Sequence, residues 1–132
     1  MRTLVALLGS GVVMGALDAL WLTLMGPRLY RPAIGELLAP RPDMRAAIAF
    51  YVIYVLGIVF LAVTPALREG SALRALAMGA ALGFVAYATY DLTNQATLRG
   101  WPLHLTLVDV AWGTVLTAAS AWGGYWLASR VG

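Results

Sequence analysis

Four long runs of apolar residues alternate with short polar connections along the 132-residue chain. The runs cover about residues 4–25, 46–66, 72–97 and 103–128, and a helix needs about 20 residues to cross a bilayer. The runs are continuously apolar and do not alternate with period two, which argues against the strands of a β-barrel. The pattern therefore predicts an all-α integral membrane bundle of four transmembrane helices, a single transmembrane domain over residues 1–132.

The three connections differ in length. The first, residues 26–45, contains four of the six prolines and four arginines. Pro32 can begin a short amphipathic helix that lies in the headgroup plane until Pro40 ends it, and a partly ordered surface loop is the alternative. The other two connections, around residues 68–71 and 99–102, are predicted to be tight turns.

The composition indicates a membrane protein, because only 11% of the residues are charged, whereas soluble domains carry about 25%. All nine basic residues are arginines, and they fall between the apolar runs, where side chains anchor at lipid headgroups. The net charge of +3 is therefore not interpreted as nucleic-acid binding. The arginines are divided almost evenly between the two faces, so they predict no orientation. The first run continues to about Met25 without a cleavage site and is expected to be a transmembrane helix rather than a signal peptide.

Two runs contain a Gly-x-x-x-Gly motif, Gly11 to Gly15 in the first and Gly79 to Gly83 in the third. Glycines at this spacing let two helices approach closely. The first and third helices run in the same direction, so we expect either direct packing between them or a homodimer contact through one of the motifs.

Three aspartates interrupt the apolar runs. Asp18, Asp91 and Asp109 are all expected roughly 10 Å inside the same membrane face, because antiparallel helices bring these positions to one level. A charged residue at membrane depth costs roughly 2.5–3.5 kcal/mol even on the lenient insertion scale. The spacing Asp-x-x-Trp occurs in the first and fourth runs, which places an indole on the face of each aspartate.

These positions predict a polar pocket that opens to one membrane face. Its predicted residues are Asp18, Trp21, Tyr51, Tyr54, Tyr87, Tyr90, Asp91, Asn94, Arg99, Asp109 and Trp112. The alternative is that these side chains only join helices through hydrogen bonds. Three carboxylates in one layer weaken this alternative, because close carboxylates repel. Arg99 would lie at the pocket mouth as a counter-ion, or would simply extend to the interface.

Several kinds of chemistry are excluded or find no specific pattern. The chain has no cysteine, so disulfides, thiolate catalysis and cysteine-bound metals are excluded. His104 is the only histidine and is interpreted as an interfacial residue rather than a catalytic base. Oxygen ligands from the three aspartates and Asn94 could hold a hard cation, but no spacing is specific for one. We predict no metal site and no cofactor.

Several motifs match a known family. They are Asp18-x-x-Trp21, Tyr30-Arg31 with Ile34-Gly35, Phe50-Tyr51-x-x-Tyr54-Val55-x-Gly57, Pro65-Ala66-Leu67, the stretch from Tyr87 to Trp101, and Asp109-x-x-Trp112-Gly113. On these residues, nearly the whole chain resembles the bacterial membrane-protein family of domain of unknown function 2177. The resemblance implies a small multi-pass protein of the bacterial inner (cytoplasmic) membrane, and it implies no activity.

Three functions are compatible with this pattern. The first is a protein that binds a small polar, cationic or lipid ligand in the acidic, tyrosine-rich pocket, with transport as an extension. The second is a membrane-embedded enzyme that modifies a lipid through aspartate acid–base chemistry. The third is a structural or accessory membrane subunit. The sequence leaves open whether the protein is an enzyme.

Overall fold

The computed structural model describes residues 1–131, and this part of the chain contains helices and turns and no strand. Four helical spans are long and apolar enough to cross a membrane, which confirms the predicted all-α membrane bundle. The first span comprises α1 (Arg2–Met25), η1 (Gly26–Tyr30), α2 (Arg31–Ile34) and η2 (Gly35–Leu37). The second comprises α3 (Met44–Ile58), η3 (Val59–Val63) and α4 (Thr64–Glu69), and the last two are α5 (Ala72–Thr97) and α6 (Leu103–Ala128).

Two tight turns hold successive spans antiparallel. Gly70 ends α4 with φ of 63°, a left-handed conformation that glycine adopts without steric cost. The Ser71 side chain then accepts a hydrogen bond from the Arg74 backbone N–H and caps α5. The second turn contains Gly100 with φ of 76°, followed by Pro102 at the start of α6. Both turns therefore use residues that suit their backbone conformation.

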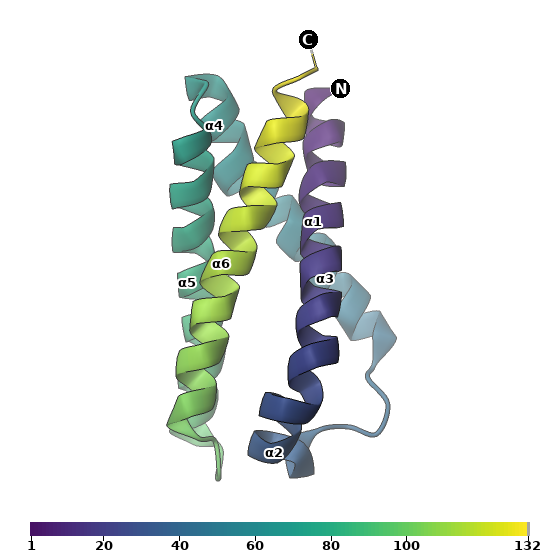
Figure 1. Ribbon diagram of the computed structural model, residues 1–132, viewed down its shortest axis with the longest axis vertical. Helices are drawn as coiled ribbons and strands as arrows, with labels where there is room; N and C mark the ends of the chain where they lie inside the picture. Colours follow the sequence, from purple (N-terminus) through teal and green to yellow (C-terminus); the bar gives the residue numbers. More distant parts are fainter. Residues whose placement is uncertain (132) are drawn as a thin grey trace.

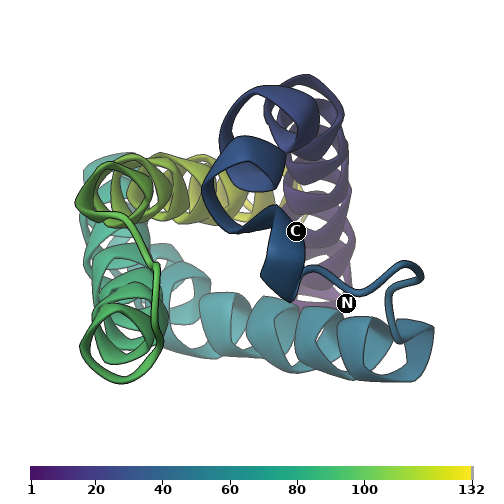
Figure 2. The ribbon, with the colours of Figure 1, turned by 90° about the horizontal axis from the view of Figure 1, so that it is seen from below.

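Helix α6 is the central element of the bundle. It packs along α1 on one side and along α5 on the other (Figures 1 and 2). Small residues allow the contact with α1, since a Cβ atom added at Gly9 would lie 3.0 Å from the Gly123 carbonyl oxygen. The buried Ser10 hydroxyl donates a 2.8 Å hydrogen bond to the Ser120 carbonyl oxygen at the same contact.

The expected packing of the first glycine motif on the second is wrong. Helix α6 separates α1 from α5, and both motifs face other helices of the same chain. Gly79 lies against Ala121 of α6, where an added Cβ atom would come within 2.8 Å of the alanine side chain. Gly15 lies against Tyr51 of α3, where an added Cβ atom would come within 2.8 Å of the hydroxyl oxygen. The motifs are thus used for packing within the chain.

A π-turn interrupts the second span before Pro65. Pro65 has no N–H for an α-helical hydrogen bond, and the preceding residues form a π-turn in which the Thr64 N–H bonds to the Val59 carbonyl. Helix α3, which precedes this turn, runs obliquely to the other helices, across the side of the bundle opposite α6 (Figures 1 and 2). Prolines and π-turns are sites at which helices commonly bend.

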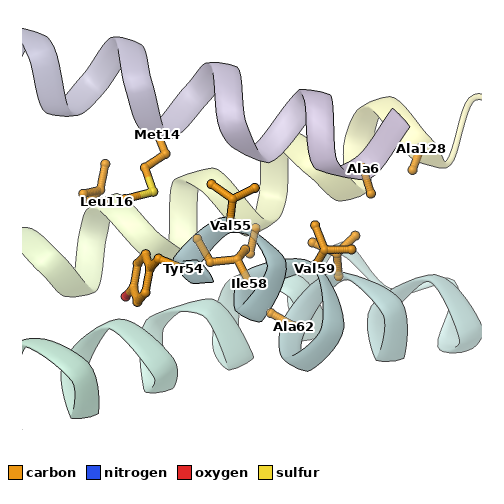
Figure 3. Close-up of a cluster of buried hydrophobic side chains, with 11 residues drawn as sticks. Ala6, Met14, Tyr54, Val55, Ile58, Val59, Ala62, Leu116 and Ala128 are labelled. Carbon is orange, nitrogen blue, oxygen red and sulfur yellow. The ribbon is translucent and has the colours of Figure 1, made fainter. Parts of the chain in front are cut away.

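The hydrophobic core lies where this oblique span meets α1 and α6 (Figure 3). Ile58, Ala62 and Val63 of the second span are fully buried there against Met14 and Leu116. Most other large apolar side chains point outward. In a bilayer they contact lipid, which is the normal arrangement for a membrane helix.

The first connection is helical from Gly26 onward rather than from Pro32. Pro27 interrupts the α-helical hydrogen bonds after α1, and the chain continues as a π-turn closed by a bond from the Arg31 N–H to the Gly26 carbonyl. The following helix α2 lies below the end of α1, displaced toward α6 (Figure 1). Leu29 and Ile34 are buried against Trp101 and Leu105, so this segment is packed onto the start of α6.

Candidate functional site

A chain of hydrogen bonds joins the first span to α6. The Trp21 indole N–H donates a 2.9 Å bond to the Tyr30 hydroxyl oxygen, and that hydroxyl donates a 2.5 Å bond to Asp109 Oδ1. The Asp109 side chain is only 5% exposed. The turn after α1 directs Tyr30 toward this carboxyl group, so a residue of the first connection belongs to the buried polar region.

Tyr30 is absent from the pocket residues expected from sequence. The reason is that residues 26–45 are predicted as an interfacial connection, from which no side chain is expected to reach α6. The Tyr30-Arg31 motif in the family resemblance is the signal that could have identified it.

The two Asp-x-x-Trp motifs meet between α1 and α6. The indole rings of Trp21 and Trp112 are stacked, with centroids 4.3 Å apart and ring planes 5° from parallel. Asp18 is partly buried next to Trp112, and it lies close enough to Asp109 for the two carboxyl groups to interact. The stack therefore forms one wall of a polar region that contains two of the three aspartates.

The third aspartate, Asp91 on α5, is fully buried at 0% exposure, and its carboxyl group neighbours that of Asp109. Within residues 1–131, neither Asp91 oxygen has a hydrogen-bond partner. A buried polar group without a partner costs roughly 1–3 kcal/mol, and more when it is charged. Native proteins retain few such groups without a further reason. Asp91 instead faces the carboxyl group of Asp109, and a proton shared between the two groups would join α5 to α6.

Two more buried polar atoms near Asp91 and Asp18 lack a partner in the described chain. They are Gln95 Oε1, one turn after Asp91, and Trp112 Nε1. Gln95 is not among the residues predicted for the site. Its place on the same helix face as Asp91 follows from the spacing of four residues, and this was the available signal.

A cavity of about 320 Å³ lies between α3 and α5, with α6 at its base. Its walls are mainly aromatic and its one charged residue is Asp109. The lining residues are Phe50, Tyr54, Ala86, Tyr87, Tyr90 and Asp109. Four of these are predicted from sequence, whereas Phe50 and Ala86 are not. Phe50 does occur in the family motif that also contains Tyr54.

Packing with α6 fixes two of the cavity's aromatic rings. The Tyr54 hydroxyl shares a 2.8 Å hydrogen bond with Thr117 Oγ1, and its ring makes an edge contact with Tyr87 at a centroid distance of 6.5 Å. The Tyr87 ring lies directly over Gly113 of α6, where any side chain would collide with it. Gly113 is therefore required for Tyr87 to occupy this position.

The other predicted residues lie outside the cavity. The Tyr51 hydroxyl donates to the Gly11 carbonyl of α1, which is a structural contact between helices. Asn94 is partly buried one turn after Tyr90, and Arg99 is exposed at the turn between α5 and α6. Trp21 and Trp112 line a separate groove on the surface between α1 and α6. The predicted set is therefore divided among neighbouring regions.

The three aspartates do not form a metal site in this structure. Within residues 1–131 there is no group of three His, Cys, Asp or Glu side chains that could hold a metal ion. Asp109 has one oxygen engaged by Tyr30. The arrangement is better described as a carboxyl pair, Asp91 and Asp109, beside an aromatic cavity.

The fold and its four candidate spans define a multi-pass, all-helical membrane protein. The chain belongs to DUF2177, a family described as predicted membrane proteins, whose model matches residues 3–126. This match confirms the resemblance inferred from the sequence motifs. No curated protein and no solved structure matches the chain.

Proposed function

We propose that this membrane protein binds an organic ammonium ion in the cavity between α3 and α5. The observation that carries the proposal is the combination of four aromatic side chains, from Phe50, Tyr54, Tyr87 and Tyr90, with the carboxyl group of Asp109. Aromatic rings attract cations through their negative faces, and such cages are used to recognise quaternary ammonium groups. A carboxylate at the base adds charge attraction, which is stronger away from water.

The lining favours an organic cation over a metal ion. Mg²⁺ and Ca²⁺ require several oxygen ligands, whereas this cavity has a single carboxyl group and mainly apolar walls. Methyl or methylene groups on the nitrogen would make apolar contact with the rings. The cavity is also within the range of about 300–1,000 Å³ that is usual for small-molecule sites.

The position of the cavity favours access from the bilayer. Tyr90 is 56% exposed and Phe50 is 50% exposed, so the edge of the cavity lies at the lipid-facing surface between α3 and α5. A cation with an apolar portion partitions into that region. Further along the second span from Tyr54, the interior of the bundle is filled by the hydrophobic core around Ile58 and Val59. This favours binding of the cation in the cavity over its transport through the protein.

The decisive experiment compares choline with 3,3-dimethylbutanol, its neutral carbon analogue, by titration of the purified protein in detergent. Choline is expected to bind and the neutral analogue is expected to bind at least about tenfold more weakly, since cation–π attraction and the carboxylate both require the charge. Asp109→Asn should reduce choline binding by a similar factor, while Asp43→Asn, far from the cavity, should not. Equal binding of both compounds to the protein would contradict the proposal.

A second candidate function has its own observation. Asp91 and Asp109 are neighbouring carboxyl groups, and Tyr30 presents a hydroxyl to one of them. Paired carboxyl groups serve as acid and base in many enzymes. A lipid-modifying enzyme would use this pair on a substrate held in the same cavity. The Asp91→Asn comparison in the Discussion separates the two functions.

We also propose that the protein resides in the cytoplasmic membrane of a bacterium. Its spans are helical, whereas proteins that span the bacterial outer membrane are typically β-barrels.

A further inference from the structure

A second cavity, of about 500 Å³, lies at the end of the bundle where the first connection meets the turn between α5 and α6. Arg31 and Gly35 line one side, and Arg99 and Gly100 line the other. One side of the cavity follows the end of α1, and the other side is the turn that joins α5 to α6. Both are connections at the ends of membrane-spanning helices, so the cavity lies at headgroup depth. It shares no lining residue with the aromatic cavity.

The charges of this cavity favour an anion. Two arginines and one glutamate, Glu36, line it, which leaves a net charge of +1. Within residues 1–131, neither Arg31 nor Arg99 has a carboxylate oxygen within 4.0 Å of its guanidinium group. The only ion pair in this part of the chain joins Arg74 to Glu69, near the other end of the bundle. Both guanidinium groups are therefore available to an incoming ligand.

The walls of the cavity are held in place by packing. Ile34 and Trp101 are each 8% exposed and pack together with Leu29 and Leu105. The Trp101 indole N–H also donates a 3.1 Å hydrogen bond to Thr106 Oγ1. The two arginine-bearing segments are thus fixed relative to each other before a ligand binds, which lowers the entropic cost of binding.

We propose that Arg31 and Arg99 bind a phosphate group of an anionic ligand in this cavity. The planar guanidinium group donates two parallel hydrogen bonds and matches the oxygens of a phosphate. Gly35 and Gly100 have no side chains, so a phosphate can approach the backbone. Basic pockets between membrane helices are known to bind phosphate-containing lipid headgroups. A lipid phosphate and a free phosphate ester present the same chemistry, and the experiment distinguishes them.

The test uses the purified protein in detergent and measures bound phosphatidylglycerol by native mass spectrometry. Arg31→Gln combined with Arg99→Gln is expected to weaken binding by about 100-fold, or about tenfold for each guanidinium–phosphate interaction that is removed. The matched control combines Arg28→Gln with Arg45→Gln, which removes the same charge from the same end of the bundle outside the cavity. The control should change binding less than about threefold, because neither Arg28 nor Arg45 lines the cavity.

A charge-retaining variant provides a result even if the glutamine variant fails to fold. Arg31→Lys combined with Arg99→Lys keeps the positive charges but removes the paired guanidinium–phosphate hydrogen bonds, so lipid binding is expected to weaken about tenfold. Equal losses in the cavity and control variants would overturn the proposal, as would equal binding of diacylglycerol, which has no phosphate.

Displacement of the lipid by millimolar inorganic phosphate would support the site with a soluble phosphate ester as its ligand. Absence of displacement would support a lipid headgroup. Asp109→Asn should leave this binding unchanged, so the outcome is separate from that of the ammonium proposal.

Discussion

The indole rings of Trp21 and Trp112 lie nearly parallel, 4.3 Å apart, at the contact between α1 and α6. The stack fixes the position of Trp21, whose N–H holds the Tyr30 hydroxyl while Tyr30 bonds to Asp109. An aromatic contact between two helices thereby positions a hydroxyl group at a buried carboxyl group.

The hydrogen bond between Trp21 and Tyr30 should be measurable as a coupling energy. Trp21→Phe and Tyr30→Phe each remove the bond while leaving an aromatic ring. In a double-mutant cycle of unfolding in micelles, we expect a coupling of about 0.6 kcal/mol and at most about 1.7 kcal/mol, the average and maximum found for side-chain hydrogen bonds in membrane proteins. Additive effects of the two substitutions would show that the bond contributes nothing to stability.

Gly113→Ala should disturb the aromatic cavity. The added methyl group would collide with the Tyr87 ring, and overfilling a packed contact typically costs about 1–3 kcal/mol. We expect a lower free energy of unfolding and a loss of choline binding as Tyr87 moves.

Gly57→Ala is the matched control for that substitution. Gly57 is also inside a helix, but an added Cβ atom there has no neighbour within 4 Å. It should be neutral or stabilising by up to about 1 kcal/mol, because alanine favours the helix. A loss of stability at Gly57 as large as at Gly113 would mean that glycine is needed for a reason other than space.

Asp91→Asn distinguishes ligand binding from lipid chemistry. If the protein binds an ammonium compound without reaction, cells that express the variant should retain the lipid profile of the wild type. Their sensitivity to quaternary ammonium compounds should change, because Asp91 neighbours the Asp109 carboxyl group that lines the cavity. The measurement compares total lipid extracts and growth at matched expression. A changed lipid profile would favour the enzyme. No change in either property would favour an accessory subunit.

Asp43→Ala should loosen the start of α3. The Asp43 carboxylate accepts hydrogen bonds from the backbone N–H groups of Arg45 and Ala46. Loss of such a cap costs about 0.5–2 kcal/mol. The first turn of α3 is exposed on all sides, so hydrogen exchange at its amides should accelerate about 2- to 30-fold, with no change in α5. Uniform acceleration in both helices would indicate global destabilisation instead.

The number of spans could be predicted from the sequence because membrane depth sets their length. The same lengths place Asp91 and Asp109 at one level, and their carboxyl groups are neighbours in the structure. Helix adjacency could not be predicted in this way. Gly79 packs against α6 and Gly11 against α3. A glycine motif therefore predicts that another helix can approach closely, but it does not identify that helix.

Tyr30 and Phe50 were missed for different physical reasons. The position of Tyr30 depends on a π-turn after Pro27, and hydropathy carries no information about such a turn. Phe50 lines the cavity together with Tyr54 of α3, but its residue type suits any lipid-facing position. The positions of both side chains follow from three-dimensional packing, which hydropathy does not describe.

The π-turn before Pro65 interrupts the span that forms one wall of the aromatic cavity. The turn lies outside the aromatic cavity and directly follows α3, which carries Phe50 and Tyr54 along one wall. We infer that a substitution at Pro65 would alter the span that carries one wall of the cavity without altering any residue that lines it. A position outside the cavity could then change the size of the ligand that the proposed site accepts.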